Sequence, residues 1–304
     1  MSGFTAPPNW SGPSSDPVDE QFGDIVSGAD LNTAEEFDVV LVGEPYDGAV
    51  ISRRGAVEGP EALRNALAGV KTHHFDTGPI DSVADIGDID IPSGSVAEVQ
   101  DALQEITGSV HSLDALPVFL GGDNSLTVPN VAPLLEDSSV GVLNVDAHLD
   151  VRKVRDEPTS GTPYRQLHEA GLDSYACIGA RHFETSTAYH DYVRENGGTV
   201  VTVEEVTANL PKAVDRALSG LDNVDRIYCS VDIDVLDAIY SGSSAPTPGG
   251  LLPRELFQLV RLVATDERIA GYELVECSPP LDVDRRTVDA AARTVAHFLS
   301  GWSA

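Results

Sequence analysis

The alternation of short apolar runs with helical patterns most strongly constrains the fold of this chain. Each apolar run is short and nearly continuous, as in a strand that is buried on both faces of a sheet. Such runs occur at residues 38–43, 117–120, 140–145, 175–179, 199–203, 226–231 and 271–275. Helical patterns lie between them at residues 60–68, 95–113, 185–195, 210–221, 253–264 and 284–299, the last with Asp284 as its expected N-cap. This order predicts an α/β fold in which helices cover both faces of a parallel sheet.

The first residues of the chain differ in composition from the rest. Residues 1–36 are rich in Pro, Ser, Gly and Asp, and they predict an extended segment on which Trp10 and Phe22 act as isolated anchors. No internal repeat or linker interrupts the remainder, so residues 37–304 are expected to form a single domain. A chain of 304 residues with 41% hydrophobic residues is compatible with one large α/β core.

The charge balance excludes two classes of partner. The chain has 49 acidic and 19 basic residues, and its formal net charge is −30. Nucleic acids and anionic membrane surfaces are poor partners, because both require positive patches. The acids are spread along the whole chain, which indicates a solvated surface suited to a cytoplasm with very high salt. No signal peptide or membrane-spanning run is visible, and the three cysteines lie in apolar runs, which favours a cytoplasmic protein with buried thiols.

Acidic motifs follow two of the predicted strands. Asp146, His148 and Asp150 come directly after residues 140–145, and Asp232 and Asp234 come after residues 226–231. In an extended segment alternate residues share a face, so we expect these side chains to converge. Ligands of open parallel sheets bind beyond the carboxyl ends of the strands. Either motif alone is equally compatible with ordinary strand-end acids of an acidic protein, whereas the two together favour a site with two Mn²⁺ ions that share carboxylates.

These motifs resemble those of the ureohydrolase (arginase–agmatinase) superfamily. The stretches that carry the resemblance are GGDNS at 121–125, NVDAHLDVR at 144–152, SVDIDVLD at 230–237, APTPGGL at 245–251, VECSPPLD at 275–282 and GEPYDGAVISRRGAVEGPEALR at 43–64. They occur in the family's order and cover about residues 37–300. The resemblance implies a three-layer α/β/α fold around an eight-stranded parallel sheet, and a catalytic domain that holds a binuclear Mn²⁺ centre with a bridging hydroxide.

By position in these motifs, the resemblance assigns expected roles. Asp146 and Asp232 would contact both metals, and His148 and Asp234 would complete the first site. The second site would be completed by Asp150 and the residue at position 124. Asp150 is also expected as a catalytic residue that accepts a hydrogen bond from the hydroxide. The other expected catalytic residue, Glu276, would pair with the planar N–H groups of a cationic amidine or guanidine.

Two departures from arginases and agmatinases narrow the expected substrate. Asn124 stands where those relatives have a His ligand, and Ser160 stands where they have a His that is implicated in proton transfer. In addition, Arg152 and Arg155 follow the DAHLDV motif and suit a substrate that bears carboxylates. With SGTPYRQL at 160–167, this combination resembles the formimidoylglutamase branch. It implies hydrolysis of N-formimidoyl-L-glutamate to L-glutamate and formamide in histidine degradation, with Arg152, Arg155, Ser160 and Glu276 binding the substrate.

Two alternatives remain open at this point. One is another amidinohydrolase, namely an arginase, a guanidinobutyrase or an agmatinase. The other is a non-catalytic relative that has lost a metal ligand at Asn124, because a neutral amide should bind Mn²⁺ more weakly than an imidazole does, or only through water. The expected partners are a small substrate with an amidine and carboxylates and further copies of the chain, since the family implies trimers or hexamers.

Overall fold

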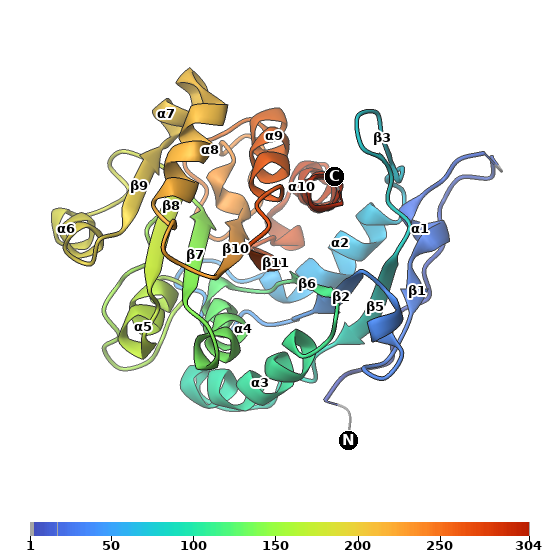
Figure 1. The fold of residues 1–304 in the computed structure, drawn as a ribbon, viewed down its shortest axis with the longest axis horizontal. Helices are drawn as coiled ribbons and strands as arrows, with labels where there is room; N and C mark the ends of the chain where they lie inside the picture. Colours follow the sequence, from blue (N-terminus) through green and yellow to red (C-terminus); the bar gives the residue numbers. More distant parts are fainter. Residues whose placement is uncertain (1–2, 17, 304) are drawn as a thin grey trace.

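The structure is a computed structural model that describes residues 3–16 and 18–303. In the described part, nine parallel strands form one central sheet in the order β1-β5-β2-β6-β11-β10-β7-β8-β9 (Figure 1). Their bounds are β1 Ser27–Gly28, β2 Val39–Gly43, β5 Val83–Asp88, β6 Leu116–Leu120, β7 Val140–Val145, β8 Ser174–Ala180, β9 Thr199–Thr202, β10 Arg226–Asp232 and β11 Ile269–Val275. A small antiparallel hairpin pairs β3 (His73–His74) with β4 (Gly78–Pro79).

Helices cover both faces of this sheet, as Figure 1 shows. One face is packed against α2 (Gly59–Leu67), α7 (Val203–Ala208), α8 (Leu210–Ser219), α9 (Pro253–Val263) and α10 (Arg286–Trp302). The other face is packed against α3 (Val96–His111), α4 (Thr127–Val131), α5 (Pro163–Ala170) and α6 (Thr187–Glu195). The remaining short elements are α1 (Phe22–Ile25) and the 3-10 turns at Ala34–Glu36, Ala56–Glu58, Asn124–Leu126, Ala132–Glu136, Ile233–Val235 and Pro279–Leu281. The expected three-layer α/β/α architecture is confirmed.

The sheet has one strand more than the expected eight, and both unpredicted strands lie at one edge. β1 belongs to the N-terminal segment and pairs with β5 through Ser27 and Gly28. β5 contains Asp85, a fully buried carboxylate that interrupts the apolar pattern by which strands were predicted. Arg64 of α2 donates to Asp85 at 2.7 Å, and the indole N–H of Trp10 donates to the same carboxylate at 2.9 Å. Buried charge is thus paired, and the N-terminal segment is held against the sheet.

The start of the last helix differs from the prediction. Asp284 does not cap α10: it adopts a left-handed backbone with φ of 56°, and the helix begins at Arg286. Instead the carboxylate of Asp282 accepts hydrogen bonds from the backbone N–H groups of Thr287, at 3.0 Å, and of Val288, at 3.0 Å. The capping carboxylate therefore lies two residues earlier in the chain than expected, and it reaches two free N–H groups of the first turn at once.

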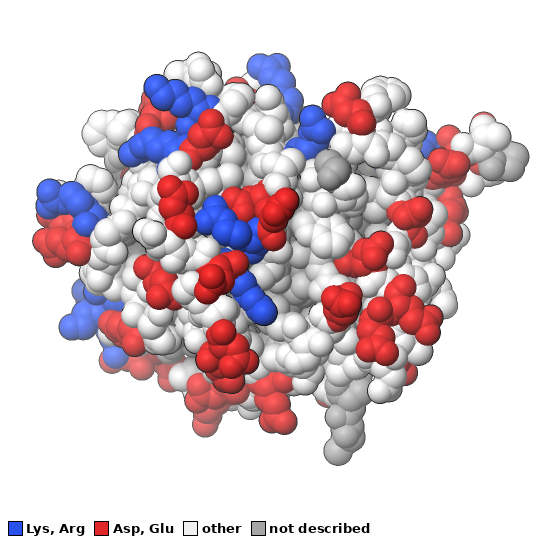
Figure 2. All heavy atoms as spheres, in the orientation of Figure 1, with Lys and Arg blue, Asp and Glu red and all other residues white. Residues whose placement is uncertain are grey.

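The surface is strongly acidic. Figure 2 shows Asp and Glu side chains scattered over the face it draws, with fewer Lys and Arg side chains between them. This distribution agrees with a formal charge of −30 that is spread along the chain. Among the described residues, no helix has both the length and the apolar character needed to cross a membrane.

Candidate active site

Four neighbouring strands at the centre of the sheet bring the predicted motifs together. β6, β11, β10 and β7 are consecutive in the sheet and parallel, so their carboxyl ends meet at one edge. GGDNS follows β6, Glu276 follows β11, Asp232 ends β10, and Asp146 follows β7. Parallel order alone thus places residues from four distant parts of the sequence side by side.

The two acidic motifs converge by turns, and the expected extended alternation is wrong. The Asp146 carboxylate accepts a hydrogen bond from the backbone N–H of His148 at 2.7 Å, and Asp232 accepts one from the backbone N–H of Asp234 at 2.8 Å. Both are turns closed by an aspartate side chain two residues upstream. They bend the chain immediately after the strand, and the φ of 43° at Asp150 bends it again. Each turn therefore points its acids back across the sheet edge.

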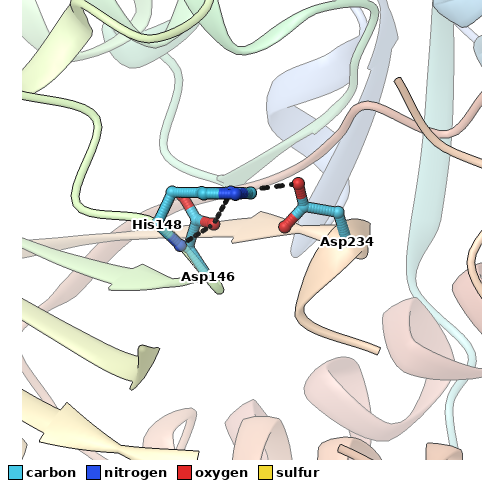
Figure 3. A group of neighbouring side chains, drawn as sticks. All are labelled: Asp146, His148 and Asp234. Atoms are coloured by element: carbon cyan, nitrogen blue, oxygen red, sulfur yellow. Dashed lines mark hydrogen bonds and ion pairs between the residues drawn. The ribbon is translucent and has the colours of Figure 1, made fainter. Parts of the chain in front are cut away.

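The first group of metal-ligating atoms comprises Asp146, His148 and Asp234 (Figure 3). The Nδ1 atom of His148 lies 3.2 Å from an Asp234 oxygen and 3.4 Å from an Asp146 oxygen. The Nε2 atom of His148 faces a carboxylate oxygen of Glu184, 3.7 Å away. A carboxylate on the far side of the ring favours the tautomer with its proton on Nε2, which leaves Nδ1 free to bind a cation.

A second group comprises Asp146, Asp150 and Asp232. In each group the ligand atoms lie within 4.8 Å of one another, and Asp146 is common to both. Asp146, Asp232 and Asp234 are almost completely buried, whereas His148 and Asp150 are partly exposed. A shared carboxylate between two adjacent sets of ligands is the arrangement of a two-metal centre.

The electrostatics of this cluster favour bound cations. Burial, and next the charge of Asp146, raise the pKa of Asp150 well above that of an ordinary aspartate. Burial and the charge of Asp234 do the same to the pKa of Asp232. Burial alone would lower the pKa of His148, but the Asp234 and Asp146 carboxylates raise it. The folded chain thus holds more negative charge here than it can stabilise by itself, which a divalent cation would offset.

The donor set also fits such cations chemically. Four carboxylates and one imidazole are hard or borderline ligands of the kind that Mn²⁺ accepts. Among the described residues, one oxygen of Asp234 and one of Glu276 are buried without a hydrogen-bond partner. Unpartnered carboxylate oxygens are costly in a protein interior unless a cation or a substrate N–H group reaches them.

The GGDNS loop turns sharply behind this cluster. A Cβ atom on Gly122 would lie 2.0 Å from the carbonyl oxygen of Tyr46, so only glycine fits where these two backbones approach. Asp123 caps the following turn, accepting from the backbone N–H of Ser125 at 3.0 Å, and it also accepts from the backbone N–H of Ala49 at 2.8 Å. Burial raises the pKa of Asp123 to about 6. The loop therefore fixes the position of Asn124 through several buried contacts.

The amide of Asn124 faces the cluster with its nitrogen. Nδ2 donates to an Asp150 oxygen at 2.6 Å and to the carbonyl oxygen of Ser160 at 3.3 Å. Oδ1 accepts a hydrogen bond from the hydroxyl of Thr127 at 2.8 Å, on the side away from Asp150. The backbone N–H of Asn124 donates to Glu276 at 3.2 Å, which leaves the other oxygen of Glu276 unpartnered.

A pocket of about 110 Å³ opens over the cluster. Of the sequence-predicted site residues, those that line it are His148, Asp150, Arg152, Ser160, Asp232, Asp234 and Glu276. Asn124 and Asp146 lie buried beneath it. Arg155 is exposed and does not line this pocket. The structure therefore brings together all of the predicted site residues except Arg155.

Several residues that the sequence did not single out support the site. Asn144 donates to an Asp146 oxygen at 3.0 Å and is itself held by the Tyr164 hydroxyl at 2.9 Å. The Arg181 guanidinium donates to the backbone carbonyls of Asp234 and Leu236. Glu184, like Arg181, follows β8, the strand beside β7, so the same strand-end rule could have found both. Asn144 lies within β7, before the end of the strand, so the strand-end rule does not identify it.

Comparison with known proteins agrees with this geometry. The Arginase family model matches residues 37–301. The chain belongs to the arginase family. It is 59% identical to a formimidoylglutamase of Halobacterium salinarum in an alignment over 298 residues that covers 96% of this chain and 97% of that protein.

Solved structures of the same family superpose closely. The formimidoylglutamase of Bacillus subtilis has a TM-score of 0.88 and 29% identity, covering 95% of this chain and 93% of that one. The formiminoglutamase of Trypanosoma cruzi, solved with two Mn²⁺ ions, has a TM-score of 0.81 and 28% identity, covering 89% and 95%. Both likenesses cover about nine-tenths of this chain or more, so the fold is that of the family.

Proposed function

We propose that this chain is a hydrolase with two Mn²⁺ ions per chain that cleaves N-formimidoyl-L-glutamate to L-glutamate and formamide, a reaction of histidine degradation. The observation that carries the proposal is the pair of metal-ligating groups that share Asp146, set beneath a pocket that also presents Glu276 and Arg152. The 59% identity to a formimidoylglutamase supports the choice of substrate.

The proposed metal ligands follow the two groups. Asp146, His148 and Asp234 would hold one ion, and Asp146, Asp150 and Asp232 the other. Asn124 lies beside the second site, with its amide nitrogen turned toward Asp150. The chemistry that two Mn²⁺ ions supply in such a site is a water of lowered pKa, able to attack an sp² carbon at neutral pH.

Two carboxylates would then act on the reacting group. Glu276 offers a buried oxygen without a hydrogen-bond partner at the pocket and would accept hydrogen bonds from the amidinium N–H groups. These bonds would orient the planar amidinium group so that its carbon faces the metal-ligating residues. Asp150, which lines the same pocket, would accept the hydrogen bond of the attacking water. In the overall reaction, a C–O bond to the amidine carbon forms and its C–N bond to the glutamate nitrogen breaks, with a proton passing to that nitrogen.

Arginine would recognise the glutamate end of the substrate. Arg152 lines the pocket beside Asp150, and it forms no salt bridge with any residue that the structure describes. Its guanidinium is therefore available to a substrate carboxylate. Ser160 lines the pocket as a second polar contact. Arg155, three residues further on, is exposed and does not line the pocket, and we propose it as the contact for the second carboxylate on the basis of its place after the DAHLDV motif.

A substrate panel distinguishes this proposal from the two alternatives. The Mn²⁺-loaded protein in molar KCl would be offered formimidoylglutamate, arginine, agmatine and guanidinobutyrate, and formamide and urea would be measured by NMR. We expect formamide from formimidoylglutamate as the fastest reaction. Faster release of urea from any of the guanidines would favour another amidinohydrolase, and no release from any of them would favour a non-catalytic relative.

The surroundings of the protein are part of the same proposal. We infer a cytoplasm of high salt from the acidic surface, and a catalytic domain of residues 37–304 preceded by the N-terminal segment 1–36. A trimer or hexamer is inferred as well from membership of the arginase family, and the fully exposed Phe75 and Phe183 are apolar surface residues that contacts between subunits would cover. Light scattering in molar KCl measures the mass, and a monomer would contradict this part of the proposal.

A further inference from the structure

A second cavity, of about 470 Å³, lies between the β3–β4 hairpin and α10, which stand beside one another in Figure 1. Along α10 the cavity extends from Arg293 to Ser300, whereas the helix itself begins at Arg286, shortly after Glu276. At 1.5 Å per residue, His297 lies about 16 Å along the helix from its start. Among the described residues, the cavity shares no lining residue with the pocket over the metal-ligating groups. It is therefore a separate candidate site.

The side chains that line this cavity reverse the charge balance of the chain, which has 49 acidic residues against 19 Lys and Arg residues. The ionisable residues of the described lining are one acid, Asp76, and five basic residues, Lys71, His73, His74, Arg293 and His297. Asp76 is already paired with Arg261 at 3.3 Å. Lys71 is likewise paired with Asp19, at 2.5 Å. Arg293 forms no ion pair or side-chain hydrogen bond with any residue that the structure describes, so its guanidinium is available to a ligand.

Two imidazoles of the cavity are suited to donate hydrogen bonds. The Nδ1 atom of His74 accepts a hydrogen bond from the backbone N–H of Asp76 at 3.2 Å, so the neutral ring carries its proton on Nε2. The ring of His297 lies edge-on to that of His74, with 5.7 Å between their centroids. Burial lowers the pKa of His297 to about 4, and the basic groups of His74, Arg261 and Arg293 contribute to this shift. The surroundings of His297 thus hold an excess of positive charge, which a bound anion would offset.

The arrangement of these donors favours one class of anion. They belong to two separate walls, with His74 on the hairpin and Arg293 and His297 on α10. A phosphate group carries about two negative charges near neutral pH and presents oxygens in several directions, whereas the two oxygens of a carboxylate lie in one plane. Arginine binds phosphate through two N–H groups at once. A cavity of about 470 Å³ has the size of a small-molecule site, so it also accommodates an organic group attached to the phosphate.

We propose that the cavity between the β3–β4 hairpin and α10 binds a phosphate group, free or carried by a small metabolite, through Arg293, His74 and His297. The site is distinct from the binuclear centre and takes no part in amidine hydrolysis. In molar salt the Debye length is about 3 Å, so the ligand is selected by direct hydrogen bonds and not by the charge of the whole chain.

Equilibrium dialysis of the Mn²⁺-loaded protein against radiolabelled inorganic phosphate, in molar KCl at neutral pH, tests this inference. We expect one phosphate per chain with a Kd on the order of 1 mM. Ribose 5-phosphate, added as a competitor, separates the two sources of the phosphate group. Stronger competition by this ester than by unlabelled phosphate identifies a phosphorylated metabolite, and equal competition identifies free phosphate. Stronger competition by glutamate than by either would overturn the assignment to phosphate, because glutamate offers only carboxylates.

Two variants and a matched control locate the bound phosphate. Arg293→Gln removes the free guanidinium and should weaken binding roughly tenfold or more. His74→Asn keeps an acceptor for the backbone N–H of Asp76 but loses the Nε2–H donor, and it should weaken binding roughly threefold to tenfold. Arg254→Gln removes an exposed arginine of the neighbouring helix α9 that does not line the cavity, and it should bind phosphate as the wild type does. All three should keep the wild-type rate of formamide release.

The outcomes separate this inference from the proposed function. No binding to the wild type would overturn the inference. Unchanged binding in Arg293→Gln or in His74→Asn would overturn it too, because the phosphate would then lie elsewhere, for example on the metal ions. An equal loss in Arg254→Gln and Arg293→Gln would show an effect of overall charge and would also overturn it. His74→Asn decides the matter even if Arg293→Gln does not fold. A wild type that binds phosphate but releases no formamide would instead contradict the proposed function alone.

Discussion

Arg152 gives the sharpest prediction about substrate selection, through the variant Arg152→Ala. Its guanidinium lines the pocket and has no acidic partner among the described residues, so its removal leaves no protein carboxylate uncompensated. A charge-assisted hydrogen bond contributes about 1.5–3 kcal/mol, and the exposure of this side chain favours the lower half of that range. The variant should therefore lose about 10-fold to 30-fold in kcat/KM for formimidoylglutamate.

The loss should appear mainly in KM, because the carboxylate end of the substrate is bound equally in the ground state and in the transition state. Steady-state formamide release over a range of substrate concentrations separates KM from kcat. Lys153→Ala is the matched control, since Lys153 is an exposed cation in the same loop that does not line the pocket. If both variants lost the same factor, the effect would be one of overall charge. If neither lost activity, Arg152 would not contact the substrate.

Three further predictions concern stability. The melting temperature should rise by roughly 5 °C or more between 0.2 and 2 M KCl, because salt screens the repulsion within a chain of net charge −30. A constant melting temperature would contradict the interpretation of the surface as halophilic. Burial lowers the pKa of His111 to about 4 in the folded chain. As the pH falls below 6.5, the His111 imidazole is therefore protonated in the unfolded chain before it is protonated in the folded chain. This difference should cost the folded state up to about 3 kcal/mol between pH 6.5 and 4. In His111→Gln, the free energy of unfolding measured by urea titration should lack this contribution to its dependence on pH. Trp10→Phe removes the N–H donor to the buried Asp85 carboxylate and should lower the free energy of unfolding by about 1–2 kcal/mol. An unchanged free energy would mean that this hydrogen bond does not stabilise the domain.

The pattern of the sequence was sufficient for the layers and for the position of the site. Acids that directly follow apolar runs lie together because parallel strands end at one edge, and this rule needs no knowledge of the loops. β5 was not predicted, since the buried Asp85 interrupts its apolar run and is neutralised by Arg64, a residue from a distant helix. The cap of α10 was assigned to Asp284 because side-chain reach across a left-handed turn cannot be deduced from spacing.

The finer chemistry of the site depends on contacts that spacing does not determine. The convergence of Asp146 with His148 follows from a side-chain turn and not from the strand period. The direction of the Asn124 amide depends on the carbonyl of Ser160 and on Thr127, which the sequence gives no reason to place beside it. Likewise, Glu184 faces His148 only because β8 lies next to β7 in the sheet.

Anomalous X-ray scattering from crystals grown with Mn²⁺ tests the central claim most directly, because it locates the ions without reference to activity. Two peaks are predicted. One should lie among Asp146, His148 and Asp234, and the other among Asp146, Asp150 and Asp232, with Asp146 in contact with both. A single peak, or a second peak that Asp146 does not touch, would contradict a binuclear centre built on the shared carboxylate.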